Sequence, residues 1–152
     1  MSTPQTAWVT GAGGLIGSHL VKLAPTVAPG WRVIGLTRRD LDLTDADAVR
    51  KRFEQDAPEL VIHCAAISGS VDCENDPQRA HTVNVDATAL LASLCADRRL
   101  VFFSTDLVFD GRRGHYVETD KPNPLGVYAR TKVEAERAVL RHANHLVLRT
   151  SL

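Results

Sequence analysis

A glycine-rich turn directly after an apolar strand is the feature that most restricts the fold of this chain. The strand is Ala7 to Thr10, and the turn that follows reads Gly11-Ala-Gly-Gly14-Leu-Ile-Gly17. Apolar residues then recur at the spacing of a helix that stops near Pro25: Leu15, Ile16, Leu20 and Leu23. Amide N–H groups at the start of such a helix attract phosphate groups, and glycine lets a phosphate approach the backbone. The same glycines could instead serve only a tight turn with close helix packing, and this alternative stays open. The order strand, turn, helix favours the phosphate site.

Short apolar runs alternate with helical patterns over the rest of the chain. The runs predicted as strands are Trp31–Leu36, Leu60–Cys64, Leu100–Ser104 and Leu146–Leu148. Three further helices are predicted. One follows an expected N-cap in Thr44-Asp-Ala-Asp47, the second is the longest amphipathic stripe, between Ala80 and Leu94, and the third runs from about Val127 to about His142. Strands that alternate with helices predict an α/β fold, a Rossmann-type doubly wound parallel sheet with helices on both faces. In such a fold the ligand lies at the carboxyl ends of the strands.

Composition limits the kinds of partner. The 152 residues include 18 Lys and Arg against 18 Asp and Glu, so the net charge is zero. Proteins that bind nucleic acids or membrane surfaces usually carry a basic excess, and neither partner is expected here. Cys64, Cys73 and Cys95 show no Cys-x-x-Cys spacing and are predicted to be reduced thiols in a cytoplasmic protein. No second ligand lies at metal spacing from His63 or His115, so no metal is predicted and both histidines are expected to be structural or on the surface.

The end of the second strand bears on the choice of dinucleotide. A Rossmann unit that prefers NAD usually has an acidic residue there, but this strand is followed by Thr37, Arg38 and Arg39. Because a guanidinium group pairs well with a 2′-phosphate, NADP(H) is favoured. Asp40 keeps NAD(H) open if the strand runs further, and both arginines could instead be ordinary surface residues. Asp42, in Leu-Asp-Leu-Thr, could accept from an adenine amino group or serve as a turn residue.

Tyr128 and Lys132 form a candidate proton-transfer pair. They lie at positions i and i+4 of a predicted helix, so they share one face. A phenol with an ordinary pKa of about 10 has to fall by about 3 units, or about 4 kcal/mol, to ionise near neutral pH. One ammonium group at ~4 Å contributes about 4 kcal/mol at an effective dielectric near 20. The sequence therefore predicts that Lys132 lowers the pKa of Tyr128 and holds cofactor ribose hydroxyls.

Ser104 and Thr105 end the fourth strand on the expected ligand side. A hydroxyl group there could bond a substrate carbonyl and align it with the tyrosine, or could cap the next turn. Since adjacent residues of a strand point to opposite faces, only one of the two is expected to serve.

Several segments resemble the extended short-chain dehydrogenases/reductases, in the dTDP-4-dehydrorhamnose reductase branch. They are Thr10-Gly-Ala-Gly-Gly-Leu-Ile-Gly17, Cys64-Ala65-Ala66, Ser104-Thr105-Asp-Leu-Val-Phe-Asp-Gly111, and Asn-Pro-Leu-x-x-Tyr from Asn123 into Tyr128-Ala-Arg-Thr-Lys132. The resemblance implies an NADP(H)-dependent reductase of a nucleotide-linked 4-keto-deoxysugar, with a small-molecule nucleotide sugar as partner and a homo-oligomer left open.

The resemblance also implies roles for individual residues. Gly11, Gly14, Leu15 and Ile16, within the turn that ends at Gly17, would contact the cofactor phosphates. Asp42 and Leu43 would contact the adenine, and Ala65 and Ala66 would approach the cofactor with small side chains. Thr105 would bind the sugar keto group with help from Asp106, Tyr128 would donate the proton and Lys132 would support it. Asn84 matches a family helix position whose role is left open.

The domain organisation implied by the resemblance is a cofactor-binding half. Residues 1–152 are expected to form the NAD(P)-binding Rossmann domain, whereas the family's C-terminal substrate domain lies outside this chain. An alternative of another class is a non-catalytic NADP-binding regulatory subunit, similar to the beta subunit of methionine adenosyltransferase. The presence of Tyr128, Lys132 and Thr105 together favours the enzyme, because binding alone does not need all three.

Overall fold

The strands of the computed structural model, which describes residues 4–151, form one parallel sheet in the order β2-β1-β3-β4-β5. Their bounds are β1 (Gln5–Thr10), β2 (Trp31–Leu36), β3 (Leu60–His63), β4 (Arg99–Thr105) and β5 (Leu146–Thr150). The chain adds β2 on one side of β1 and then β3, β4 and β5 on the other side. This change of direction is the doubly wound arrangement predicted from the sequence. Residues 1–3 and 152, which the predicted domain includes, lie outside the described residues.

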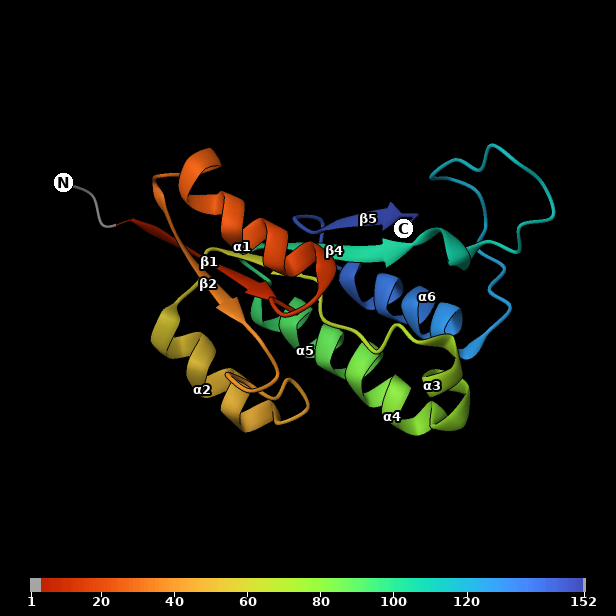
Figure 1. The fold of residues 1–152 in the computed structure, drawn as a ribbon, viewed down its shortest axis with the longest axis horizontal. Coiled ribbons are helices and arrows are strands. Elements are labelled where there is room, and N and C mark those ends of the chain that lie inside the picture. The colour runs from red at the N-terminus through yellow and green to blue at the C-terminus, as the bar shows by residue number, and fades with distance from the viewer. Residues whose placement is uncertain (1–3, 152) are drawn as a thin grey trace.

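Helices cover the sheet unevenly. Figure 1 shows α1 (Leu15–Val27) on one side, with α2 (Ala46–Asp56), α5 (Ala87–Leu94) and α6 (Val127–Val139) on the other. The predicted fold class is therefore confirmed, with element ends displaced by a few residues. Helix α1 contains Pro25 in its last turn, and Asp45, within the predicted capping segment, accepts a hydrogen bond from the Ala48 N–H. Within residues 4–151 no helix combines the length and apolar character needed to cross a bilayer.

The connection between β3 and β4 is more complex than the sequence pattern suggests. It contains two short helices, α3 (Ser70–Asn75) and α4 (Pro77–His81), and a π-helical segment, η1 (Thr82–Asp86), that leads into α5. The apolar stripe from Ala80 to Leu94 is thus not one regular α-helix. Segment η1 contains Asn84, which is buried and bonds to the loop after β3, and π-helical turns frequently lie at functional sites.

The main core lies between the sheet and the α2, α5, α6 layer. Trp8 is fully buried, contacts Phe53 edge-on with ring centroids 5.4 Å apart, and donates its indole N–H to Asp56. Side chains from all three helices and from the central strands complete the cluster, among them Val49, Val61, Leu91, Leu100 and Val139. This packing fixes the strand ends at which the site is built.

A buried chain of hydrogen bonds crosses the core behind those strand ends. The Ala65 N–H donates to the Thr10 hydroxyl, whose oxygen lies 2.6 Å from His63 Nδ1. His63 Nε2 lies 2.9 Å from the Thr88 hydroxyl, which donates onward to the Asn84 carbonyl at 2.7 Å. Since Thr88 donates its proton to Asn84, His63 Nε2 is the donor to Thr88 and Nδ1 accepts from Thr10. His63 is therefore a structural residue, as predicted, and it is neutral because burial lowers its pKa to about 3.

This neutral histidine has a measurable consequence for acid stability. Between its ordinary pKa of about 6.5 and its native pKa of about 3, only the unfolded chain binds the proton, so stability falls as the pH falls. The expected contribution is about 1.4 kcal/mol per pH unit between pH ~6 and ~4.5. Urea unfolding of His63→Gln across this range should show a shallower pH dependence by that amount.

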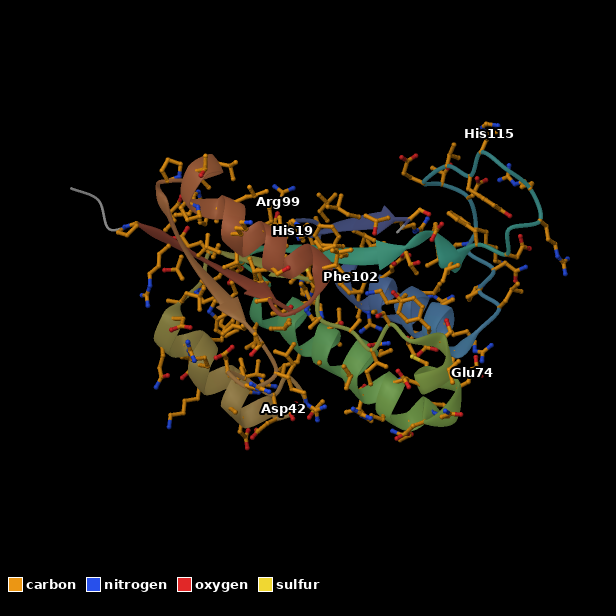
Figure 2. The ribbon with its side chains drawn as sticks, viewed as in Figure 1. His19, Asp42, Glu74, Arg99, Phe102 and His115 are labelled. Carbon is orange, nitrogen blue, oxygen red and sulfur yellow. The ribbon has the colours of Figure 1, made fainter. Side chains whose placement is uncertain are left out.

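The same variant should lose about 1–3 kcal/mol at pH ~7, because Thr10 and Thr88 lose their partner. His115→Gln is the matched control, since His115 is exposed on a loop far from the network (Figure 2). Equal pH slopes for wild type and His63→Gln would contradict this account.

Candidate active site

A cavity of about 760 Å³ lies at the carboxyl ends of the strands. The structure brings nearly all sequence-predicted site residues to its wall. These are Gly11, Gly14, Leu15, Ile16, Gly17, Arg38, Asp42, Leu43, Ala65, Ala66, Thr105, Asp106, Tyr128 and Lys132. Arg39 is exposed and does not line the cavity. Residues from opposite ends of the sequence therefore share one site.

The glycine turn lies against the backbone of the loop that follows β3. Gly11 has φ +67°, and a Cβ there would lie 2.7 Å from the Ala65 amide nitrogen, so only glycine fits. A Cβ on Gly17 would lie 2.7 Å from the Gly11 carbonyl carbon, which shows the close packing expected for the helical glycine. No side chain caps the start of α1, where Gly14 is the N-cap. The first amides of the helix therefore lie beside the cavity, and none of them has a side-chain acceptor within residues 4–151.

In the turn after β2, the residues that bear on the choice between NAD(H) and NADP(H) make different contacts. The Asp40 carboxylate accepts from both the N–H and the hydroxyl of Thr37, so it serves the turn itself. Asp42 Oδ1 likewise accepts from the N–H and hydroxyl of Thr44, which gives Asp42 the turn role while it still lines the cavity. Arg38 lies 3.9 Å from Asp42 Oδ2 and remains largely exposed.

Strand β4 ends in two residues with hydroxyl groups, Ser104 and Thr105. Thr105 donates to Asp106 at 3.2 Å and accepts from the Leu107 N–H, so it caps the 3₁₀ turn η2 (Asp106–Val108) and also lines the cavity. Ser104 also has atoms at the cavity wall. Its Oγ is buried and has no hydrogen-bond partner among residues 4–151.

Tyr128 does not have the lowered pKa that the sequence analysis predicts, and that prediction is wrong for this structure. The pKa of Tyr128 is raised, chiefly because burial disfavours the phenolate, with smaller contributions from Cys73 and Asp106. A hydrogen bond with Thr105 opposes this shift. The prediction relied on an attraction from Lys132 that does not contribute to the shift here, and it left out the desolvation of the phenol, which is the largest cause.

Lys132 points into the sheet. Its Nζ donates to the Phe103 carbonyl at 2.6 Å and lies 3.9 Å from the centroid of the Phe102 ring. The side chain is 3% exposed, and burial lowers its pKa to about 8. The ammonium is therefore positioned by β4, and it does not act on the tyrosine as the spacing alone suggested.

Asn84, whose role the sequence left open, clamps the cavity wall. Its Oδ1 accepts from the Ile67 N–H at 2.8 Å, and its Nδ2 donates to the Ile67 carbonyl and to the Thr131 hydroxyl. Thr131 in turn donates to the Tyr128 carbonyl at 2.7 Å. Asn84 thus ties the loop after β3 to the helix that carries Tyr128 and Lys132.

Some cavity residues escaped the sequence analysis. Arg79 of α4 and Val83 of η1 both line the cavity, four residues apart. Helical spacing places Val83 on an apolar stripe of the sequence. It gives no reason to expect that the exposed Arg79 lines a ligand cavity. Thr150 and Ser151 at the end of β5 also line the cavity, and only their place after a strand could have indicated it.

Comparison with known proteins gives a family match over almost the whole chain. Residues 6–152 match the family described as the RmlD substrate binding domain. The chain is 42% identical over 140 residues to dTDP-4-dehydrorhamnose reductase of Mycolicibacterium smegmatis, which covers 90% of this chain and 42% of that protein. It is 38% identical over 141 residues to methionine adenosyltransferase 2 subunit beta of Danio rerio, covering 88% of this chain and 43% of that protein.

The fold is also similar to solved structures. Dehydrorhamnose reductase of Bacillus anthracis, solved in complex with NADP, matches with a TM-score of 0.90 and 27% identity over 99% of this chain and 55% of that chain. The chain thus spans less than half the length of the two relatives above and about half of this structure.

The raised pKa of Tyr128 can be measured directly, because Tyr116 is the only other tyrosine. In Tyr116→Phe, ultraviolet titration without cofactor should show phenolate only above pH ~10, the ordinary phenol value. Tyr128→Phe serves as the control and reports Tyr116, whose pKa is raised by its hydrogen bond to Asp110. A transition well below the ordinary value in Tyr116→Phe would restore the sequence-based prediction.

Proposed function

We propose, because the chain belongs to the RmlD substrate binding domain family, that it binds NADP(H) and carries the proton-transfer residues of a reductase. The substrate class is a nucleotide-linked 4-keto-deoxysugar, as for the dTDP-4-dehydrorhamnose reductases to which it is similar. The observation that supports this most strongly is that Thr105, Tyr128 and Lys132 share one cavity with the Gly11–Gly17 turn.

The cavity suits a dinucleotide at its glycine end. A Cβ on Gly11 would fill space against Ala65, and the uncapped start of α1 offers N–H groups to a diphosphate. Gly11, Gly14, Leu15, Ile16 and Gly17 would hold the diphosphate. Asp42 and Leu43 would border the adenine, Arg38 would pair with the 2′-phosphate, and Ala65 and Ala66 would lie along the cofactor.

The other end of the cavity supplies acid chemistry. NADPH, when bound, supplies the hydride. Tyr128 gives its proton to the carbonyl oxygen, and its raised pKa keeps the phenol protonated before transfer. Thr105 orients that oxygen by donating to it the hydroxyl proton that it otherwise gives to Asp106. Lys132, charged below pH ~8, stabilises the phenolate that proton transfer creates, either through a polar group between the two residues or after its ammonium turns from the Phe103 carbonyl.

The domain organisation follows from the same proposal. Residues 1–152 form the NAD(P)-binding half, and the nucleotide of the substrate is held by a substrate domain outside them. The short coverage of the relatives supports this division, because the matched segment is 42% of one reductase and 43% of the methionine adenosyltransferase subunit.

A second candidate is a non-catalytic, NADP-binding regulatory subunit. The 38% identity to methionine adenosyltransferase 2 subunit beta favours it, at nearly the same level as the reductase match. The two candidates differ in turnover, since a regulatory subunit would bind NADPH without oxidising it.

Cofactor fluorescence tests the proposal directly. NADPH emission should change on binding, and the reduced cofactor should be consumed when a dTDP-linked 4-keto-6-deoxysugar is added. Tyr128→Phe should bind NADPH but lower the rate by about 10²-fold or more, as expected for loss of a general acid. Binding without oxidation would favour the regulatory candidate, and an unchanged rate in Tyr128→Phe would remove the proposed proton donor.

The two arginines after β2 allow a test of the preference for NADP(H) over NAD(H), with Arg38→Ala as the test variant and Arg39→Ala as its control. Arg38→Ala should weaken NADPH about tenfold and leave NADH almost unchanged, because a charged hydrogen bond to the 2′-phosphate is lost. Arg39→Ala should bind both cofactors like wild type, since Arg39 does not line the cavity. Equal losses for NADPH and NADH in Arg38→Ala would show that Arg38 does not select NADP(H).

A further inference from the structure

Phe102 is a fully buried residue of β4 that contacts two nitrogen-bearing side chains. The Lys132 ammonium lies 3.9 Å from the centroid of its ring, within the range of a strong cation–π contact. The His63 imidazole stacks on the same ring, with centroids 5.7 Å apart and planes tilted by 27°. Phe102 is labelled in Figure 2, near the point where β4 passes over α6.

The ring matters because Lys132 has few other groups to stabilise its charge. The side chain is 3% exposed, and none of the ion pairs within residues 4–151 includes it. Glu136 of the same helix raises the pKa of Lys132 by its charge but makes no ion pair with it, and its carboxylate is held by a two-pronged bond from Arg149, at 2.9 and 2.7 Å. The Phe103 carbonyl, at 2.6 Å, is the one hydrogen-bond acceptor that Lys132 has in this part of the chain.

His63 is suited to lie next to this ammonium only as a neutral ring. Thr10 and Thr88 hold both of its nitrogens, which fixes the ring in place and leaves it uncharged. A protonated imidazole would repel Lys132. Cys64, at the exit of β3, is the other titratable group facing Lys132 from the sheet, and burial raises its pKa to about 11, so it is an uncharged thiol.

We propose that Phe102 is a positioning residue of the site, whose ring, supported by the neutral His63, holds the Lys132 ammonium charged and in place at the cavity. The consequence for cofactor affinity rests on the proposed function. The placement of the ammonium itself does not, and it can be tested in the protein alone.

Lysine NMR is the direct test, because the chain has only four lysines, Lys22, Lys51, Lys121 and Lys132. In wild type the Lys132 side-chain CH₂ protons next to Nζ should be shifted upfield by the ring, and the group should titrate near pH 8. Lys132→Arg assigns the signal. A Lys132 signal without the upfield shift would overturn the proposal even if every Phe102 variant failed to fold.

Phe102→Leu removes the ring, and Phe103→Leu is the matched control. The control makes the same change one residue along the strand and keeps the carbonyl that Lys132 uses. Without the ring the charged form loses a stabilising contact, so the acid constant of Lys132 should rise roughly 3- to 10-fold and its titration should move to lower pH. Phe103→Leu should titrate like wild type. An unchanged Lys132 titration in Phe102→Leu would overturn the proposal.

NADPH binding against pH separates this inference from the proposed function. Binding that needs the ammonium should weaken as the pH rises through about 8 in wild type, and this loss should occur at lower pH in Phe102→Leu. A wild type that binds no NADPH at any pH would refute the proposed function and leave the NMR result standing. In Phe102→Leu the Lys132 titration could move to lower pH while NADPH binding is still lost at the same pH as in wild type. That result would overturn the positioning role of Phe102.

Discussion

The backbone contact between the Gly11 turn and the loop after β3 is the constraint on which the cavity depends. Strands β1 and β3 are neighbours in the sheet, with Thr10 opposite His63. Their chains must separate immediately beyond that pair, because one leads to α1 and the other runs across the carboxyl edge. The separation begins with no side chain between them, since a Cβ at Gly11 would lie 2.7 Å from the Ala65 nitrogen. A larger residue would push the two segments apart and move the α1 amides away from the wall formed by Ala65 and Ala66.

Side-chain hydrogen bonds hold the irregular loop that forms this wall. After Cys64, whose N–H still donates to the Thr10 carbonyl, this segment makes no strand pairing within residues 4–151, so its buried backbone groups need other acceptors and donors. Thr10 supplies one to Ala65, and Asn84 supplies two to Ile67. Because Asn84 lies in the π-helical segment and also bonds Thr131 of α6, the wall is coupled to the helix of Tyr128 and Lys132. Leaving such a group unpaired costs about 1–3 kcal/mol, so the coupling is firm relative to thermal energy.

The sequence predicts the parts of this arrangement that depend on local spacing. The doubly wound parallel sheet, the glycine turn and the shared cavity of Tyr128 and Lys132 follow from periodicity and from the rule that parallel strands present their carboxyl ends together. The contacts of Lys132 were not predictable in this way. Its acceptor at Phe103 and the ring at Phe102 come from a strand about 30 residues earlier, and no spacing rule joins them. Choosing Arg38 over Arg39 likewise required the path of the turn, which depends on the bond between Asp40 and Thr37.

Burial raises the pKa of Tyr128, where the sequence predicts a lowered one, and a raised pKa suits a proton donor. A reductase needs its acid protonated when the carbonyl arrives, and a phenol whose pKa is raised by burial meets that need at neutral pH. The cost appears after transfer, when a buried phenolate has to be stabilised. Lys132 lies on the same helix face and remains charged below pH ~8, but its ammonium is directed at Phe103 and Phe102. Stabilising the phenolate therefore requires either a polar group that relays the charge from Lys132 or a turn of the lysine away from the Phe103 carbonyl. A ribose diol between the two residues would act as such a relay, since its hydroxyl groups can accept from the ammonium and donate to the phenolate.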